Sequence, residues 1–478
     1  MYKKREHIHF MGIGGIGMSG IAEIVKLQGY TVSGCDSSSE GKSITHLQNI
    51  GCTVFQNHNA CHVDNADVLV YSSAIKKDHP EIVAALERAI PVIPRALMLA
   101  ELMRTKYSVA VTGAHGKTTT TSLISHIMIE AQKNPTVIVG GVLKNIDSNA
   151  QLGDSNLLIA EADESDRSFL YLNPTMAVVT NIDNEHLETY SGLDDIKKTF
   201  QDFLARLPFY GKAIVCIDDP NIQAILPLPH VCTVKYGLHS NADIMGTIVS
   251  LGTMQSVFDV FKNKDSKGFA LATPLHLGRV TLNIPGDHNV LNALAALSLC
   301  LEFDIPFATI AKALESFFGV ERRFEFKGTF KGTEVFDDYG HHPTEIEKTL
   351  AVAQHRTNAG GRLHVIFQPH RYTRTEKLWR EFVELFASAK NRFSVATLIV
   401  ANIHPASEEP IPNITSLRLT EAINAMNPEL TIMHYDNFDQ IIEAIEKIAQ
   451  PNDLVLTIGA GKINQVGSEI VSKYRAYP

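Results

Sequence analysis

Short apolar runs alternate with longer amphipathic segments along most of the chain. Apolar residues that recur every three to four positions are typical of helices, whereas short continuous apolar runs are typical of strands buried on both faces of a parallel sheet. The predicted strands cover residues 7–11, 31–35, 53–55, 68–71, 109–111, 156–160, 176–180, 334–338, 363–367, 396–400, 431–435 and 454–458. The pattern therefore predicts the α/β class.

The chain is long enough for more than one domain. It has 478 residues, and at about 150 residues a domain this length predicts three. We place the domains at residues 1–105, 106–322 and 323–478, with joins near 100–106 and 320–325. A ligand site between two such domains would be closed by domain movement.

A strand, a glycine loop and a helix start follow one another in residues 107–124, YSVAVTGAHGKTTTTSLI. Gly113 and Gly116 let the backbone approach a phosphate, and the N–H groups at a helix start point at an anion. The usual G-x-x-x-x-G-K-[ST] motif would need a glycine where this chain has a valine, so the loop is a shortened form. We expect Lys117 to contact the β- and γ-phosphates and the Thr118 hydroxyl to bind Mg²⁺. The alternative is an ordinary strand-to-helix turn with a surface lysine.

Acidic segments follow two predicted strands of the middle domain. Residues 161–166 read EADESD, and residues 181–186 read NIDNEH. Ligands in parallel sheets bind beyond the carboxyl ends of the strands, so both segments should lie on the same side as the phosphate loop. For Glu164 and Asp166 the simplest interpretation is that of solvated loop acids.

A second glycine loop follows the first predicted strand. Gly12, Gly14 and Gly17 fit the G-x-G-x-x-G pattern, and Asp36 stands 19 residues after Gly17. This spacing predicts a Rossmann-like domain that binds a diphosphate. An NAD-dependent oxidoreductase has such a loop, but that function leaves the phosphate loop and the acidic segments unexplained.

The composition of the chain argues against some classes of function. The 43 Lys and Arg residues against 52 Asp and Glu give a net charge of −9, so no overall positive field is present to bind nucleic acid or an anionic membrane. The six cysteines show no C-x-x-C pair, and no apolar run approaches about 18 residues. We therefore expect a cytoplasmic protein.

Seven segments occur in a fixed order: GAHGKTTT, EADESD, TNIDNEH, GDHNVLNALAA, GVERRFE, DDYGHHPTEI and FQPHRYTRT. Together with GIGGIGMSGIAE near the start, they resemble the ATP-dependent peptidoglycan-precursor (Mur) ligases over nearly the whole chain. The resemblance implies a Rossmann-like first domain, a P-loop ATPase-like central domain with a parallel sheet, and a Rossmann-like last domain. It also implies ATP and Mg²⁺ as cofactors, and an acyl phosphate that an amine attacks.

The resemblance implies site residues in every domain. The catalytic residues would be Lys117, Glu161 and His186, and the metal ligands Thr118, Glu161 and His186. ATP would contact Gly113, Ala114, His115, Gly116, Lys117, Thr118, Thr119, His288, Asn289, Asn292 and Arg323. The UDP-sugar would contact Gly12, Gly14, Gly15, Gly17, Asp36, Ser72, Ser73 and Arg95. The amino acid would contact Tyr339, His341, Arg371 and Arg374.

Some of these residues have simpler interpretations. Without the resemblance, His186 would be a loop histidine, and Asn292, three positions after Asn289 on one helix face, would be a packed polar residue. Arg371 and Arg374 would be two cations of a solvated helix face. Three segments depart from the usual family residues: Ala114 replaces threonine, Glu185 replaces aspartate, and residues 401–405 lack the more usual acid and tyrosine.

Within the family, GIGGIGMSG and HRYTRT are most similar to the branch that adds L-alanine to the lactyl carboxylate of UDP-N-acetylmuramate. This is the first amino-acid addition in peptidoglycan precursor synthesis. A branch that attaches a whole tripeptide to the same sugar nucleotide is the nearest alternative. A P-loop nucleotide switch would need neither the amino-acid contacts nor the first glycine loop. The expected partners are these two small molecules, with no nucleic acid and no membrane, and the expected state is a monomer or homodimer.

Overall fold

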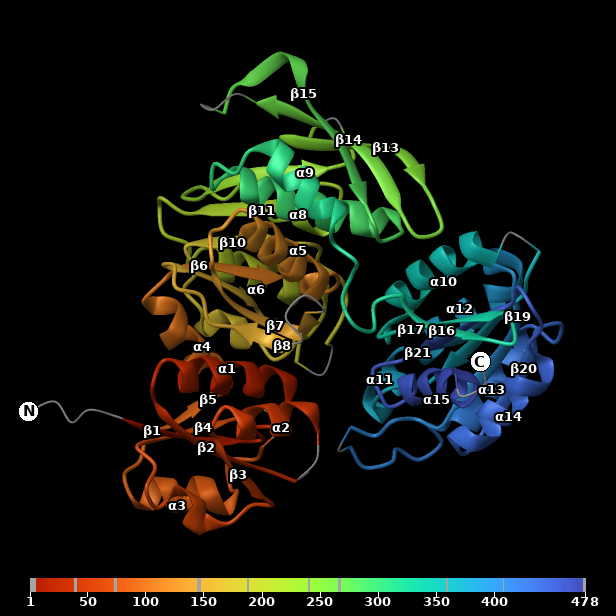
Figure 1. The fold of residues 1–478 in the computed structure, drawn as a ribbon, viewed down its shortest axis with the longest axis horizontal. Coiled ribbons are helices and arrows are strands. Elements are labelled where there is room, and N and C mark those ends of the chain that lie inside the picture. Colours follow the sequence, from red (N-terminus) through yellow and green to blue (C-terminus); the bar gives the residue numbers. More distant parts are fainter. Residues whose placement is uncertain are drawn as a thin grey trace, which may run out of the picture. The chain divides into compact units, whose positions relative to one another are not determined.

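The computed structural model describes residues 6–37, 41–72, 75–143, 148–186, 189–239, 241–264, 268–357, 360–406 and 408–475. These residues form three sheets, one within each predicted domain range (Figure 1). They divide into two compact units, of which the first contains the first two sheets and the second contains the third sheet. The predicted three-domain α/β class is confirmed, while the exact boundaries stay a prediction.

The first sheet has five strands in the order β3-β2-β1-β4-β5, and all four neighbouring pairs are parallel. Its strands are β1 (His7–Met11), β2 (Thr31–Asp36), β3 (Thr53–Gln56), β4 (Val68–Tyr71) and β5 (Val92–Pro94). Helices α1 (Ile16–Leu27) and α2 (Lys42–Asn49) lie on one face and α3 (Pro80–Glu87) on the other (Figure 1), with η1 (Ala60–Val63) beside α3 and α4 (Arg95–Arg104) after β5. The chain order reverses beside β1, so the first glycine loop lies at the switch point where such sheets bind ligands.

The central sheet has ten strands in the order β15-β14-β13-β12-β11-β10-β6-β9-β7-β8. They are β6 (Tyr107–Thr112), β7 (Thr136–Leu143), β8 (Ser148–Gln151), β9 (Leu157–Glu161), β10 (Met176–Val179), β11 (Lys212–Cys216), β12 (Cys232–Gly237), β13 (Ile244–Leu251), β14 (Ser256–Lys264) and β15 (Ala270–Leu282). The associated helices are α5 (Lys117–Glu130), η2 (Ser168–Tyr171), α6 (Leu193–Leu204), α7 (Pro220–Ala224), α8 (Asp287–Leu301) and α9 (Phe307–Glu315). β6 lies between β9 and β10 and is parallel to both, so three strand ends meet around the phosphate loop.

The expectation of an entirely parallel central sheet is wrong at one edge. β7 pairs with β8 antiparallel because a connection of only a few residues cannot reach back to start a parallel strand. The sequence pattern also missed β13, β14 and β15, which extend the other edge (Figure 1). β13 and β15 contain many exposed positions and therefore no continuous apolar run. β14 alternates buried with half-buried residues and is polar toward its end, so it also lacks such a run.

The third sheet has the order β16-β17-β21-β18-β19-β20. Its strands are β16 (Glu325–Phe330), β17 (Thr333–Asp338), β18 (Leu363–Phe367), β19 (Val395–Ala401), β20 (Thr431–Tyr435) and β21 (Leu454–Ile458), and its helices are α10 (Pro343–Thr357), α11 (Tyr372–Lys377), α12 (Trp379–Phe393), α13 (Ser416–Met426), α14 (Phe438–Ile448) and α15 (Asn464–Arg475). Two apolar cores cover its two faces. β16 is antiparallel to β17, so this sheet is mixed rather than fully parallel.

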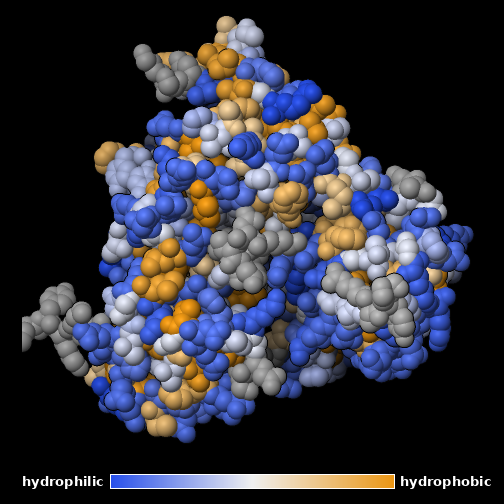
Figure 2. All heavy atoms as spheres, viewed as in Figure 1, coloured by the Kyte–Doolittle hydropathy of each residue, from blue (hydrophilic) through white to orange (hydrophobic). Residues whose placement is uncertain are grey.

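The surface is largely polar on the side that Figure 2 draws. Hydrophilic residues, interspersed with smaller apolar groups, cover much of the face drawn in Figure 2. Among the described residues, the helices are too short or too polar to pass through a lipid bilayer.

Candidate active site

The phosphate loop is held against the end of β10 by backbone and side-chain contacts. Gly113 has φ +133°, and a Cβ built there would lie 2.2 Å from the Thr180 Oγ1. The Thr180 hydroxyl donates to the His115 carbonyl at 2.6 Å. The Asn181 amide accepts from the His115 N–H at 2.8 Å and donates to its carbonyl at 2.9 Å. The loop is therefore fixed by residues that directly follow β10.

This packing gives a testable expectation for Gly113→Ala. Besides the backbone strain of the positive φ, the new methyl group would overlap Thr180, so we expect a loss of stability of ~2–4 kcal/mol together with loss of ATP binding. Gly192→Ala is the matched control, because Gly192 has φ +144° with nothing within 4 Å of the added Cβ. Thermal unfolding and nucleotide titration of both variants measure the difference, and equal effects would contradict the close packing.

Lys117 starts α5 and turns its ammonium group back over the loop. Its Nζ donates to the Gly113 carbonyl at 2.7 Å, to the Ala114 carbonyl at 3.1 Å and to Glu164 Oε1 at 2.9 Å. Burial alone would lower the pKa of Lys117, but the carboxylates of Glu164, Asp163 and Glu161 outweigh it and raise this pKa above its usual value. Lys117 is therefore a fixed cation beside the loop.

His186 shares the same carboxylate from the opposite side. Its Nε2 lies 3.4 Å from Glu164 Oε1 and 3.4 Å from Glu185 Oε2. The backbone of His186 has the left-handed φ of +55°. The structure thus brings Lys117 and His186 to one carboxylate oxygen. The interpretation of Glu164 as a solvated loop acid is wrong, since only 2% of its surface is exposed.

Thr118 and Glu161 form the second part of the loop environment. The Thr118 hydroxyl donates to Glu161 Oε1 at 3.2 Å, and Glu161 Oε2 accepts from the Gly140 N–H at 2.9 Å. Glu161 is the last residue of β9, so its carboxylate emerges at the carboxyl end of the strand next to β6. The two oxygens are a hard donor set of the kind that Mg²⁺ prefers.

Asn292 of α8 packs against the phosphate loop and is hydrogen-bonded to Asn289 of the same helix. Asn292 is buried, and its Oδ1 would lie 2.5 Å from a Cβ at Gly116. It accepts from the Thr120 hydroxyl and donates to Asn289 Oδ1, both at 3.2 Å. Asn292 therefore contacts the loop region as a packed polar residue. Thr119, the remaining predicted member of the loop, is buried in the first turn of α5.

The first glycine loop is fixed by β2. Gly12 has φ +74°, its N–H donates to the Cys35 carbonyl at 2.8 Å, and the Gly14 N–H donates to Asp36 Oδ2 at 2.9 Å. Gly15 caps the start of α1. Asp36 is thus bonded to the loop backbone.

Arg95 joins this loop to the acids of the central sheet. Its Nη1 would lie 2.5 Å from a Cβ at Gly17, and its Nη2 lies 3.3 Å from Asp163 Oδ2. Burial opposes ionisation of Asp163, but Arg95 and Lys117 lower its pKa. Of the two predicted serines, Ser72 has its Cβ 3.8 Å from the position of a Cβ at Gly12, and Ser73 lies outside the described residues. The first unit therefore contains both predicted loops and an ion pair between them.

The second unit gathers three of the four residues predicted to bind the amino acid. The Tyr339 and His341 rings are edge to face with centroids 5.6 Å apart, and the His341 and His370 centroids are 6.1 Å apart. Arg374 Nη1 donates to His370 Nδ1 at 3.1 Å. Burial is the largest cause that lowers the pKa of both histidines, and the positive charge of Arg374 lowers it further. The pKa of His341 falls well below its usual value and that of His370 falls to about 3. Both rings are therefore neutral, and the charge of Arg374 is not cancelled by them.

The remaining predicted residues of this unit have other partners. Arg371 lies 3.7 Å from Glu408 Oε1, so its charge is shared with a carboxylate. Arg323 lies 3.9 Å from Glu345 Oε1, with its guanidinium 5.4 Å from the Tyr339 ring centroid. The N–H of His288 donates to Asp287 Oδ1 at 2.7 Å. Arg323 therefore contacts the Arg374 group through the Tyr339 ring, whereas Arg371 and His288 contact acids outside this group.

Comparison with known proteins identifies the family. Models described as the Mur ligase family catalytic domain, the Mur ligase middle domain and the Mur ligase glutamate ligase domain match residues 7–107, 111–300 and 322–461. A UDP-N-acetylmuramate–L-alanine ligase of Geobacter sp. (strain M21) is 46% identical over 477 residues, covering 100% of this chain and 99% of the relative. The chain belongs to the Mur ligase family.

Further relatives of this Mur ligase have the same name. A UDP-N-acetylmuramate–L-alanine ligase of Syntrophus aciditrophicus is 45% identical, covering 99% of this chain and 95% of the relative. The crystal structure of the UDP-N-acetylmuramate–alanine ligase from Thermotoga maritima has a TM-score of 0.81 and 26% identity, covering 99% of this chain and all of that one. The family prediction made from the ordered motifs is confirmed.

Sequence reasoning missed several residues of this Mur ligase that define the site. Thr180 and Asn181 hold the phosphate loop, and their position directly after a predicted strand was the available signal. Glu164 pairs with Lys117, which no spacing rule indicates. His370 lies next to Arg374 through a turn in the backbone at Arg371, where φ is +70°, and the sequence gives no sign of that turn.

Proposed function

We infer that this chain uses ATP to join L-alanine to UDP-N-acetylmuramate. The observation that carries this function is the full-length identity of 45–46% to ligases named for that reaction. The prediction of the alanine-adding branch is thereby confirmed, and the oxidoreductase and nucleotide-switch alternatives are set aside. The chain is an ATP-dependent ligase.

The chemistry requires an activated carboxylate. A carboxylate has no leaving group, so the γ-phosphoryl group of ATP moves to the lactyl carboxylate oxygen and ADP leaves. The amine then attacks the acyl carbon, and phosphate leaves as the amide forms. Phosphoryl transfer depends mainly on positioning and on neutralising charge. In our proposal Lys117 and the N–H groups of the α5 start bind the β- and γ-phosphates, and Glu164 holds Lys117 in place.

The oxygens of Thr118 and Glu161 fit Mg²⁺, which would neutralise phosphate charge next to Lys117. His186 with Glu164 and Glu185 forms a second candidate group, whose ligand atoms lie within 4.8 Å of one another. His186 is an unusual Mg²⁺ ligand, because this ion prefers oxygen. The carboxylates of the group supply the preferred donors.

The metal assignment predicts a change in the Mg²⁺ requirement. Glu161→Gln removes the charge but keeps the side-chain shape, so we expect the Mg²⁺ concentration for half-maximal turnover to rise at least about tenfold. Glu130→Gln, at the exposed opposite end of α5, is the matched control. ADP release measured over a Mg²⁺ series gives the answer, and an unchanged Mg²⁺ dependence would remove Glu161 from the metal site.

The other two substrates have separate contacts in this proposal. The loop with Gly12, Gly14 and Asp36 binds the UDP part, and Arg95 lies between this loop and Asp163, where the reacting carboxylate would pass. In the second unit, Arg374 binds the carboxylate of L-alanine beside Tyr339 and His341. An α-amino group has a pKa near 8, so roughly a tenth is already the free base at pH 7, and a strong dedicated base is unnecessary.

The function is tested by product mass. The protein is incubated with UDP-N-acetylmuramate, ATP, Mg²⁺ and all twenty amino acids, and we expect one new product with the mass of the sugar nucleotide plus alanine minus water. ADP release should need both the sugar nucleotide and the amino acid. ATP hydrolysis indifferent to both would contradict the ligase function, and a product formed only with a tripeptide would favour the other branch.

We further propose a cytoplasmic location. The cysteines are all free in the structure, in keeping with a reducing compartment. A monomer or homodimer remains the prediction for the oligomeric state.

A further inference from the structure

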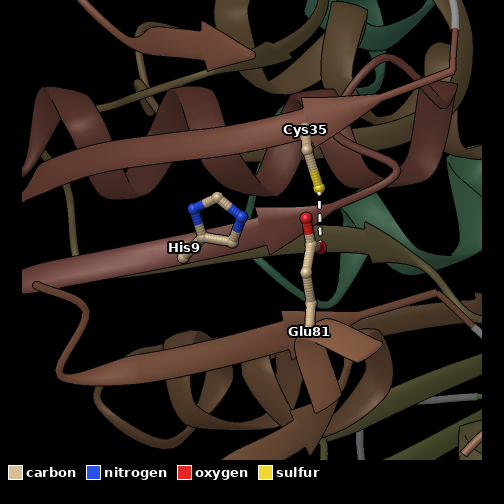
Figure 3. Close-up of side chains that lie close together, drawn as sticks. All are labelled: His9, Cys35 and Glu81. Atoms are coloured by element: carbon tan, nitrogen blue, oxygen red, sulfur yellow. Dashed lines mark hydrogen bonds between the residues drawn. The ribbon is translucent and has the colours of Figure 1, made fainter. Parts of the chain in front are cut away.

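A group of sulfur, imidazole and carboxylate side chains is buried in the first domain, and none of these side chains belongs to the residues predicted to bind a substrate. His9 comes from β1, Cys35 from β2 and Glu81 from the first turn of α3. All three residues are fully buried, with 0% of their surface exposed. One ring nitrogen of His9, the Cys35 sulfur and one Glu81 oxygen lie within 4.8 Å of one another. Figure 3 shows a His9 ring nitrogen facing the other two side chains.

The hydrogen bonds assign a lone pair to the inward nitrogen of His9. His7 Nδ1 lies 2.8 Å from the Asn65 carbonyl, which can only accept, so a neutral His7 carries its proton on Nδ1. Its Nε2 then accepts from the Ser33 hydroxyl at 2.7 Å, and the Ser33 oxygen accepts from His9 Nδ1 at 2.7 Å. His9 Nε2 is buried, and none of the residues that the structure describes forms a hydrogen bond with it. A histidine whose other nitrogen is held in this way is typical of a metal ligand.

One further donor atom, Nδ1 of His58, lies next to the sulfur and the carboxylate. Cys35 Sγ is 3.0 Å from Glu81 Oε2 and 3.1 Å from His58 Nδ1, and His58 Nδ1 is 3.4 Å from Glu81 Oε2. These separations are close to the edges of a tetrahedron around an ion bound at about 2.0–2.3 Å.

Glu81 presents only one of its oxygens to this group. Its Oε1 already accepts from the Asn59 N–H at 2.8 Å and from His62 Nδ1 at 3.0 Å. Its Oε2 remains for the inner group. The His58 side chain is 27% exposed, so an ion has a path of entry from solvent.

We propose that His9, Cys35, His58 and Glu81 form a structural site for a transition-metal ion, of which Zn²⁺ is the best match. One sulfur, two imidazole nitrogens and one carboxylate oxygen are ligands that suit Zn²⁺ and do not suit Mg²⁺. His9, Cys35 and Glu81 are already within reach of one ion. His58, which contacts Cys35 and Glu81, would supply the fourth ligand after a shift of its ring toward His9 and so leave the ion no open position for a substrate. On binding, the Cys35 thiol loses its proton to solvent and the thiolate forms the bond to the metal.

A metal ion bound at this site would cross-link four separate segments of the first domain. Its ligands come from β1, β2, the connection after β3, and α3. Cys35 also accepts the N–H groups of Gly12 and Ile13 through its carbonyl, at 2.8 and 3.1 Å. Its neighbour Asp36 holds Gly14. Metal binding at the Cys35 side chain would therefore support the shape of the first glycine loop.

The experiment measures metal content and Co²⁺ absorption of the full chain. After incubation with Zn²⁺ and desalting against a weak chelator, we expect one zinc per chain by elemental analysis. Replacement by Co²⁺ should give tetrahedral visible bands and a sulfur-to-cobalt charge-transfer band in the near ultraviolet. The Glu164, Glu185 and His186 group contains no sulfur, so this band separates the two sites.

Cys35→Ser should lose the sulfur-to-cobalt band, and His9→Gln should bind the metal ion more weakly. Cys52→Ser is the matched control, because Cys52 is a buried cysteine outside the group, and this variant should keep the band and the metal affinity. Because a ligand variant can also fail to fold, the unaltered protein is treated with a strong chelator as well, and its melting temperature should fall and recover when Zn²⁺ is added. Absence of stoichiometric zinc, a Co²⁺ spectrum without the sulfur band, or the same spectrum in Cys35→Ser would overturn the proposal and leave a metal-free hydrogen-bonded cluster.

Discussion

Lys117→Ala should lower turnover by at least about 10³-fold, because the variant loses the cation that neutralises charge on the transferred phosphoryl group. UDP-N-acetylmuramate should still bind with unchanged affinity, since its proposed contacts belong to the first glycine loop. Rapid measurement of ADP release and calorimetric titration with the sugar nucleotide check the two parts separately. Loss of sugar-nucleotide binding would show that the two loops have been assigned to the wrong substrates.

A structural effect of the same substitution has to be separated from the catalytic one. Removing Lys117 leaves Glu164 buried without its cation, which typically destabilises a protein by about 3–5 kcal/mol. The double variant Lys117→Ala/Glu164→Gln removes that charge, so it should regain stability without regaining turnover. Lys106→Ala is the matched control, because Lys106 donates to the Ser155 carbonyl just before the opposite end of β6. Recovery of activity in the double variant would contradict a phosphate-binding role.

Arg374→Ala should raise the KM for L-alanine by about thirtyfold or more and leave the KM for ATP nearly unchanged. The reason is that a buried carboxylate deprived of its cation costs roughly 2–5 kcal/mol. Burial, the main cause that lowers the pKa of His341 and His370, remains in the variant, so we expect neither ring to replace the lost charge. Initial rates with each substrate varied in turn give both constants.

The control for this prediction is another arginine of the same domain. Arg380 in α12 pairs with Glu384 at 2.6 Å and is 86% exposed, so Arg380→Ala should change neither constant. If Arg374→Ala raises both constants equally, it acts on folding or closure rather than on the amino acid. Arg371, already beside Glu408, should have a smaller effect than Arg374.

The sequence predicted the parts of the fold that depend on local pattern. β1 and β4 begin and end where the apolar runs predict, and the glycine loops lie at the strand ends expected for a parallel sheet. The antiparallel strands β8 and β16 were missed because β8 is a short and mostly polar segment and the apolar residues of β16 are interrupted by polar residues and a glycine. Their place is set by pairing with a neighbouring strand, which is a long-range property.

Only part of the candidate site could be predicted from the sequence, because its other contacts also depend on long-range packing. Lys117 and Thr118 follow from the spacing of the loop, whereas the pairing of Lys117 with Glu164 depends on how residues 162–166 turn back after β9. A carboxylate in an acidic segment gives no sequence signal of its burial. The lowered pKa of His370 likewise results first from its burial and then from the charge of Arg374, four positions along the chain, and neither is visible in the sequence pattern.

The attachment of the phosphate loop to Thr180 and Asn181 lowers the conformational entropy that is lost when the nucleotide binds. A loop whose backbone already has its final shape loses little conformational entropy when the ligand arrives. More of the intrinsic binding energy of ATP is then left for orienting the γ-phosphoryl group toward the acceptor carboxylate. Preorganisation of this kind predicts slow exchange of the Ala114 and His115 amide hydrogens with or without nucleotide.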